Sequence, residues 1–219
     1  HDRVTRRNGS FEKTLNGAKL LHERGIYVVF KFIVMDQNVH EVNDAEEMAT
    51  LSGVPIVFNA NVTARDNLDR DPMKLRIALE DHKLLIRKYF SDKVQKLGVD
   101  PGGHDLSCGM GKTLVSVNAY GDVFPCPTVP IPAGNVRYCS LKEIWNESPF
   151  LREVRRFPRM DKMHGCPECH LRGYCIRCPG NTFTETGDLY GPSPAACQEA
   201  LARKAVDDEL RGVEEETPL

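Results

Sequence analysis

The sequence predicts an α/β fold in two modules: alternating helices and strands over residues 1–97, then a small cysteine-rich α+β module over residues 98–219. In the first module, apolar residues recur at helical spacing between short continuous apolar runs. All eight cysteines lie between Cys108 and Cys197, and such a shift in composition is typical of a boundary between modules. Glycines and a proline at positions 98–103 place the boundary there, because they break regular structure.

The first module is predicted to alternate helix and strand. A helix begins at Ser10, and Gly25 stands where helices commonly end. Residues 26–35 and 56–62 are rich in apolar residues and predict two strands buried on both faces. Asn38 and Glu41 have the spacing of a capping box for a helix over residues 42–51. With an amphipathic helix over residues 75–89, this order favours a parallel sheet or part of a barrel.

The second module is predicted to begin with a hairpin, in which residues 114–119 and 123–124 pair across a turn at 120–122. Ser140 and Glu143 have the spacing of another capping box, which would open a short helix carrying Trp145. Beyond Cys166, dense cysteine, glycine and proline leave little room for regular structure before a last helix over residues 194–211. The acidic residues 214–216 predict a solvated tail.

Composition excludes several classes of function. A length of 219 residues with 41% hydrophobic content allows a core without crosslinks. The net charge of -2, without a dense run of Lys or Arg, argues against nucleic acid as a partner. The longest apolar stretch, residues 26–35, is interrupted by Lys31 and too short to cross a membrane. No signal peptide is visible, so we expect a cytoplasmic protein, and the first residue, His1, suggests part of a longer chain.

The cysteine pattern allows three interpretations. A disulfide framework fits poorly, because such scaffolds are typically small secreted chains. A structural zinc site could use the two C-x2-C pairs of Cys166, Cys169, Cys175 and Cys178. It would leave Cys108, Cys126 and Cys197 without a role. Iron–sulfur clusters could use seven, since thiolates at short spacings with ligands from a distance are normal for such clusters.

The same residues resemble a known family, the radical S-adenosylmethionine (SAM) enzymes with a C-terminal SPASM domain, which holds two auxiliary iron–sulfur clusters. Its pattern is C-x9–15-G-x4-C, then C-x2-C-x5-C-x3-C, then a final C. The matching positions here are Cys108, Gly121, Cys126, Cys166, Cys169, Cys175, Cys178 and Cys197. The first module is similar to the closing part of the family's partial (β/α)6 barrel. The resemblance thus implies a C-terminal part of a radical SAM enzyme.

The family's crossed ligation implies two ligand sets. Auxiliary cluster I would be held by Cys108, Cys126 and Cys178, and auxiliary cluster II by Cys166, Cys169, Cys175 and Cys197. Two residues separate Cys175 from Cys178 where the family usually has three. The first set has only three thiolates, so its fourth iron is expected to be open or bound by a non-cysteine ligand. His104, Asp105 and Cys139 are alternatives, although a buried, inert Cys139 is the simpler interpretation.

The resemblance also implies an activity. In this family a further [4Fe-4S] cluster, bound by a C-x3-C-x2-C motif, cleaves S-adenosylmethionine to a 5′-deoxyadenosyl radical, and a flavodoxin- or ferredoxin-type protein supplies electrons. No such motif occurs in this sequence, so the chain alone is expected to be inactive. The full-length protein is expected to be an oxidoreductase that modifies a peptide or protein. By analogy its auxiliary clusters are expected to be [4Fe-4S] and to serve electron transfer or substrate positioning. The alternative is a zinc-stabilised binding module without catalysis.

Overall fold

The computed structural model describes residues 1–90, 108–156 and 163–213. The chain divides into two compact units. The first contains residues 1–62 and 75–77, and the second contains residues 63–74 and the chain from residue 78 onward. The boundary predicted near residue 98 and the predicted acidic tail lie outside the described residues.

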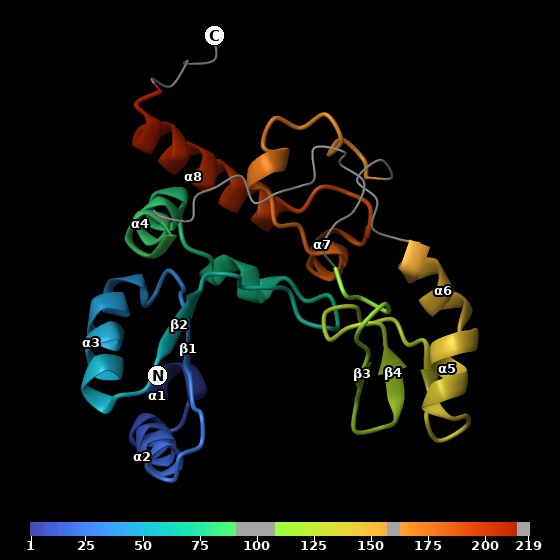
Figure 1. Cartoon of the computed structure of the whole chain (residues 1–219), viewed down its shortest axis with the longest axis horizontal. Coiled ribbons are helices and arrows are strands. Elements are labelled where there is room, and N and C mark those ends of the chain that lie inside the picture. Colours follow the sequence, from blue (N-terminus) through green and yellow to red (C-terminus); the bar gives the residue numbers. More distant parts are fainter. Residues whose placement is uncertain (91–107, 157–162, 214–219) are drawn as a thin grey trace. The chain divides into compact units, whose positions relative to one another are not determined.

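The first unit is built on a two-stranded parallel sheet (Figure 1). Strand β1 (Phe30–Ile33) pairs with β2 (Ile56–Asn59) in a register that places Phe30 opposite Ile56. The chain connects them through the turn η1 (Val39–Glu41) and helix α3 (Val42–Ser52). Before the sheet come α1 (Asp2–Thr5) and α2 (Ser10–Glu23). The predicted order of helix and strand is therefore confirmed.

Two details of that prediction are wrong. Half-buried and exposed residues alternate along β1, where Ile33 is exposed, and β2 has the exposed Val57 among half-buried residues. The strands are therefore not buried on both faces. The predicted capping box is also absent from the helix start. The Asn38 side chain instead accepts a hydrogen bond from the Met35 amide at 2.7 Å and donates to the Ile33 carbonyl at 3.1 Å. An asparagine side chain can accept a hydrogen bond from a backbone amide and donate one to a backbone carbonyl. Here it does both, and it closes the turn after β1.

The second unit contains a three-stranded antiparallel sheet in the order β3-β4-β5. The predicted hairpin is formed by β3 (Ser116–Val117) and β4 (Asp122–Phe124), and the sequence reading missed β5 (Gly134–Asn135). Helices α5 (Leu141–Glu147) and α6 (Pro149–Arg156) follow. The Ser140 and Glu143 capping box at the start of α5 is present as predicted. The sheet and the two helices share one apolar core, which contains Met110, Val123, Val129, Ile144, Leu151, Val154 and Met163.

The cysteine-rich segment is more regular than predicted. It contains the turn η5 (Arg172–Tyr174) and helix α7 (Pro179–Thr186), which the density of Cys, Gly and Pro had argued against. A proline is tolerated in the first turn of a helix because its missing N–H would have no partner there, and Pro179 occupies that position. The last helix, α8 (Pro194–Arg211), has the predicted bounds.

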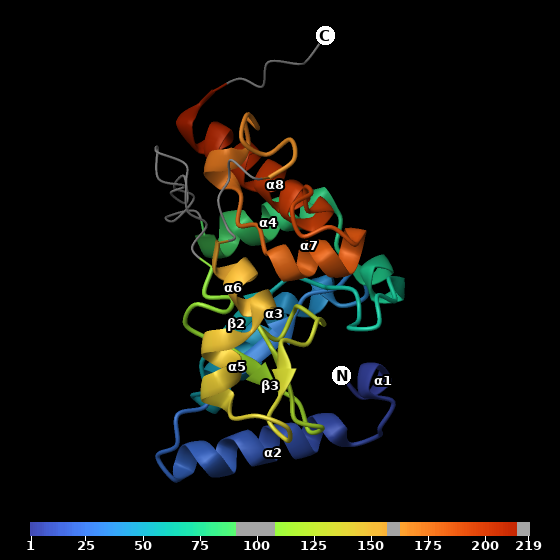
Figure 2. The same ribbon diagram turned by 90° about the vertical axis from the view of Figure 1, so that its right-hand side faces the viewer.

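The long helix α8 packs against α4 (Leu79–Phe90), which follows the short turn η2 (Asp71–Leu75). The two helices lie side by side in both views (Figures 1 and 2). Ile86 of α4 and the buried Ala202 and Val206 of α8 form their contact. At the exposed edge, the Arg87 guanidinium donates two hydrogen bonds to Glu209, at 2.8 and 2.6 Å.

Within the described ranges, none of the helices combines the length and the apolar character that crossing a membrane requires.

Candidate metal centre

All eight cysteines lie in described segments, and all are free thiols. The seven expected ligands are half-buried. Cys139 is exposed, and its thiol donates a weak hydrogen bond to the Asn135 carbonyl at 3.8 Å. The simpler interpretation of Cys139 as a buried apolar residue is therefore wrong. His104 and Asp105 lie outside the described residues.

The first group of thiols comes from three separate segments. Cys108 precedes a tight turn, Cys126 follows strand β4, and Cys178 is the N-cap of α7. The Thr128 hydroxyl lies 3.2 Å from the Cys126 sulfur and 3.7 Å from the Cys178 sulfur. The charges of Cys178 and Cys126 both act on Cys108. The Thr128 hydroxyl therefore lies beside two thiols from separate segments, Cys126 and Cys178, and Cys108 is near enough for both charges to act on it.

Glycine allows α7 to approach the Cys126 segment. A β-carbon at Gly180 would lie 2.1 Å from the Thr128 hydroxyl oxygen and 2.9 Å from the Thr128 carbonyl carbon. Both distances are shorter than van der Waals contact, so a larger residue would push the start of α7 away from Thr128. Because Cys178 caps that helix, the missing side chain of Gly180 keeps Cys178 beside Cys126.

The turn after Cys108 is tied to both the hairpin and the helices. The Gly111 amide donates to the Pro125 carbonyl at 2.9 Å, directly before Cys126. The Arg155 side chain of α6 donates to the Gly111 carbonyl at 2.7 Å, while its guanidinium lies over the ring of Trp145, 4.6 Å from the centroid. Gly111 has a positive φ of 63°, a conformation that glycine adopts without strain. The turn thus holds Cys108 near Cys126.

The second group of thiols contains Cys166, Cys169, Cys175 and Cys197. The first three lie on one loop, in which the Cys169 amide donates to the Cys166 carbonyl at 3.2 Å. Cys197 lies in the first turn of α8, its amide donating to the Ser193 carbonyl at 2.9 Å. Their charges act on one another: those of Cys197, Cys166 and Cys169 on Cys175, and those of Cys166 and Cys169 on Cys197.

A buried tyrosine fastens this loop to α8. Tyr174, next to Cys175, packs with Leu171 against Ala200 of the helix. Its hydroxyl donates a hydrogen bond of 2.6 Å to the buried Asp207 carboxylate, which also accepts one from Arg211 at 2.8 Å. Burial, with the Asp207 hydrogen bond, raises the pKa of Tyr174 to about 12. The contact fixes Cys175 relative to the helix that carries Cys197.

Burial also raises the pKa values of four of the thiols. It raises the pKa of Cys175 to about 11, and neighbouring thiolates add to the effect. The pKa values of Cys108, Cys166 and Cys197 are raised for the same first reason, burial. Such thiols are protonated at neutral pH unless a bound cation displaces the proton. The raised pKa values of these four thiols do not favour nucleophilic catalysis, which needs a thiolate.

In the sequence, Arg177 lies between Cys175 of the second thiol group and Cys178 of the first. Its side chain is buried and donates through Nε and Nη2 to the Gly191 carbonyl at 3.0 and 2.6 Å, and through Nη2 to the Leu189 carbonyl. Burial lowers its pKa, whereas the charges of Cys166, Cys175 and Cys178 oppose that shift. No partner for its Nη1 atom is found within the described residues.

Sequence reasoning missed Thr128, Arg177 and the bond between Tyr174 and Asp207. A charged residue between two cysteines was the available signal for Arg177. In the described part of the chain, no three Cys, His, Asp or Glu side chains are placed to hold a single metal ion. The two thiol groups are thus defined by their mutual electrostatic effects and hydrogen bonds, and not by coordination distances.

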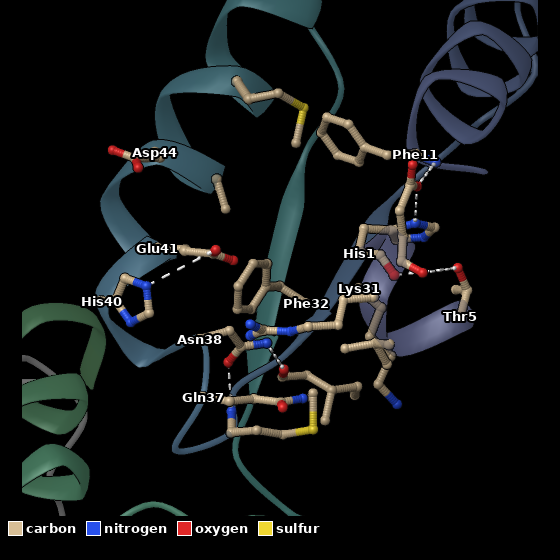
Figure 3. A pocket seen from close by; sticks show the side chains of 17 residues that line it. His1, Thr5, Phe11, Lys31, Phe32, Gln37, Asn38, His40, Glu41 and Asp44 are labelled. Atoms are coloured by element: carbon tan, nitrogen blue, oxygen red, sulfur yellow. Dashed lines mark hydrogen bonds and ion pairs between the residues drawn. The ribbon is translucent and has the colours of Figure 1, made fainter. Parts of the chain in front are cut away.

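The first unit holds a separate cavity of about 940 Å³ (Figure 3), within the size range of small-molecule sites. Phe32 of β1, Phe11 of α2 and Met48 of α3 form apolar parts of its wall. Asn38, which closes the turn after β1, and the exposed pair of His40 and Glu41 supply polar groups on one side. This mixed lining lies beside the carboxyl end of β1, where ligands gather in parallel α/β folds.

One part of this chain matches a known family. Residues 108–170 match the family model of SPASM, an iron–sulfur cluster-binding domain. The match contains Cys108, Cys126, Cys166 and Cys169. The matched residues lie in the second unit, which therefore contains a segment similar to an iron–sulfur cluster-binding domain.

Several related proteins align with more of the chain than the family model does. The chain is 24% identical to an AdoMet-dependent heme synthase of Methanosarcina barkeri, over 89% of this chain and 62% of the relative. Sporulation killing factor maturation protein SkfB of Bacillus subtilis is 25% identical, over 69% of this chain and 39% of the relative. PqqA peptide cyclase of Streptomyces rochei is 34% identical, over 48% of this chain and 29% of the relative.

The family model and these relatives confirm the resemblance seen in the sequence. The chain spans about three fifths of the length of the heme synthase relatives, 62% and 60%.

Proposed function

We propose that this chain is the part of a radical SAM enzyme that closes the catalytic barrel and holds two auxiliary iron–sulfur clusters. The observation that carries the proposal is the sorting of seven thiols into two groups. Cys108 responds to Cys126 and Cys178, whereas Cys175 responds to Cys197, Cys166 and Cys169. These are the two ligand sets that the family resemblance implies.

The residues fit such clusters in their chemistry as well as in their grouping. Thiolates are the usual ligands of [4Fe-4S] clusters, and most of these thiols need a cation to lose their protons. Cys178 lies at the N-terminus of α7, where the helix dipole stabilises negative charge. When bound, the clusters would supply electron transfer or an iron site for substrate, and the protein's part is to position and tune them.

The grouping also bears on the zinc alternative. A zinc site built on the two C-x2-C pairs would use Cys178 with Cys166, Cys169 and Cys175. In the structure Cys178 shares the Thr128 hydroxyl with Cys126, which favours its membership of the other set. Two cluster sites explain this placement, whereas one zinc site leaves it without a role.

We infer that the full-length protein modifies a peptide or protein substrate, with S-adenosylmethionine, a third [4Fe-4S] cluster and a flavodoxin- or ferredoxin-type reductant. SkfB, named as a maturation protein, and PqqA peptide cyclase support a peptide substrate. A second candidate is a reaction on the path to heme, because heme synthases align with 89% and 94% of this chain.

Metal analysis tests the cluster proposal. The chain, purified without oxygen, is expected to be brown and to contain about eight iron atoms with a similar amount of acid-labile sulfide, as two four-iron clusters imply. One zinc ion without sulfide would instead establish the binding module.

Substrate class needs the full-length enzyme. Reduced enzyme is mixed with S-adenosylmethionine and either candidate peptides or heme precursors, and 5′-deoxyadenosine and substrate mass are measured. A mass change in a peptide is expected. A change only in the heme precursor would replace the peptide proposal with the second candidate.

A further inference from the structure

The buried guanidinium of Arg177 is unusual because its charge has no anionic partner at hydrogen-bonding distance in the described structure. The residue is 7% exposed, and its Nε and Nη2 groups donate only to the neutral carbonyls of Leu189 and Gly191. Burying a cation is costly unless a negative charge compensates it. The position of Arg177 therefore calls for a nearby anion.

The neighbours of Arg177 identify where this anion would lie. In the sequence Arg177 stands between two expected ligands, Cys175 and Cys178. Cys166 and Asp188 are also near enough for their charges to act on it. Asp188 is already engaged: it accepts a hydrogen bond from the Tyr190 amide at 2.7 Å and lies 3.3 Å from His164. The remaining neighbours are cysteine sulfurs, which become anionic when they bind a metal, and two of them belong to the second thiol group.

The Nη1 atom of Arg177 has no hydrogen-bond partner among the described residues. It is nevertheless buried. A buried donor without a partner costs about 1–3 kcal/mol, so native proteins rarely retain one. The opposite side of the same guanidinium is held in place by the two carbonyls, which leaves Nη1 as the group free to contact a ligand.

We propose that Arg177 is a positioning residue for the second cluster, and that its Nη1 group donates a hydrogen bond to a sulfur atom of the cluster held by Cys166, Cys169, Cys175 and Cys197. This inference rests on the proposed function. A thiolate-bound cluster is anionic, because thiolates and sulfides outweigh the charge on the irons, and hydrogen bonds to its sulfurs shift its reduction potential. Because reduction adds negative charge, a nearby guanidinium favours the reduced form and raises the potential.

The test compares cluster potentials in the reconstituted full chain, by redox titration followed with electron paramagnetic resonance. Arg177→Gln is expected to shift the midpoint potential of one cluster to more negative values and leave the other cluster less affected. Arg177→Lys keeps the charge but lacks the planar fork, so a smaller negative shift is expected. The matched control is Arg172→Gln: it removes the same charge from the same loop, but that side chain donates to the Pro167 carbonyl at 3.0 Å, and unchanged potentials are expected.

Each outcome decides the inference. Iron-loaded Arg177 variants with wild-type potentials would overturn it, as would shifts of equal size in Arg172→Gln. If Arg177→Gln binds no iron, Arg177→Lys decides: a loaded cluster with a lowered potential supports the inference, and an unchanged potential overturns it. Failure of both Arg177 variants to fold, seen by circular dichroism, would assign Arg177 a structural role alone. A wild-type chain without iron would refute the proposed function before any variant is compared.

Discussion

Single residues around Thr128 determine whether the first thiol group can form. Its hydroxyl contacts both Cys126 and Cys178, and only a residue without a side chain fits at Gly180 beside it. The close approach of the α7 backbone to Thr128 therefore depends on Gly180. The reason is steric, because the φ of Gly180 is not positive.

Gly180→Ala is expected to destabilise the protein by about 1–3 kcal/mol, the usual cost of overpacking, and to reduce the iron bound by the first thiol group. Urea unfolding and iron analysis measure the two effects. Gly17→Ala is the matched control, because a β-carbon there meets nothing within 4 Å and alanine favours a helix. Equal stability and iron content in both variants would show that the contact with Thr128 is dispensable.

Buried polar contacts at the residue scale also order the second thiol group. Tyr174→Phe removes the donor to Asp207 and leaves a buried carboxylate with fewer partners, so a loss of about 1–3 kcal/mol in unfolding free energy is expected. Thermal or urea unfolding measures it. Tyr138→Phe is the control, because Tyr138 is 87% exposed. A Tyr174→Phe chain as stable as the wild type would mean that this hydrogen bond does not hold the loop to α8.

Helix ends show what could be predicted at the scale of elements. The Ser140 and Glu143 box and the bounds of α8 follow from local signals that act within one turn, and both are present. Asn38 shows the limit of such signals, because its side chain had a competing use in the turn after β1. Helix α7 was missed because dense Cys, Gly and Pro argued against regular structure, although Pro179 is tolerated in its first turn.

The capping box at α5 predicts a pH dependence. Glu143 accepts hydrogen bonds from the Ser140 amide and hydroxyl, and these bonds lower its pKa from the ordinary 4.5. A lowered carboxyl pKa contributes stability above the unfolded-state pKa and loses it as the pH falls through the folded value. Wild type is therefore expected to exceed Glu143→Gln in melting temperature at pH 6, and the difference should vanish at acidic pH. A constant difference down to pH 3 would contradict this.

At the scale of the whole molecule, the two proposed ligand sets cross: each combines cysteines that are far apart in the sequence. The spacing of the cysteines alone does not determine this division. Cys175 and Cys178 are close neighbours in the sequence, yet the structure associates the first with Cys197 and the second with Cys126. The seven cysteines could be named as candidate ligands from the sequence, and their division came from the family resemblance. The contacts that agree with this division, from Thr128 to Cys178 and from Tyr174 to Asp207, are tertiary and have no local signal.

This division is tested most directly by iron analysis of paired cysteine variants of the full chain, reconstituted without oxygen. Cys126→Ala and Cys178→Ala are each expected to lose one cluster, about half of the iron, and the double variant to lose no more, since each four-iron cluster is bound as a unit. Cys178→Ala combined with Cys175→Ala is expected to lose both clusters. If the Cys126 and Cys178 double variant lost all iron, or the Cys175 and Cys178 double variant kept half, the two-group arrangement would be wrong.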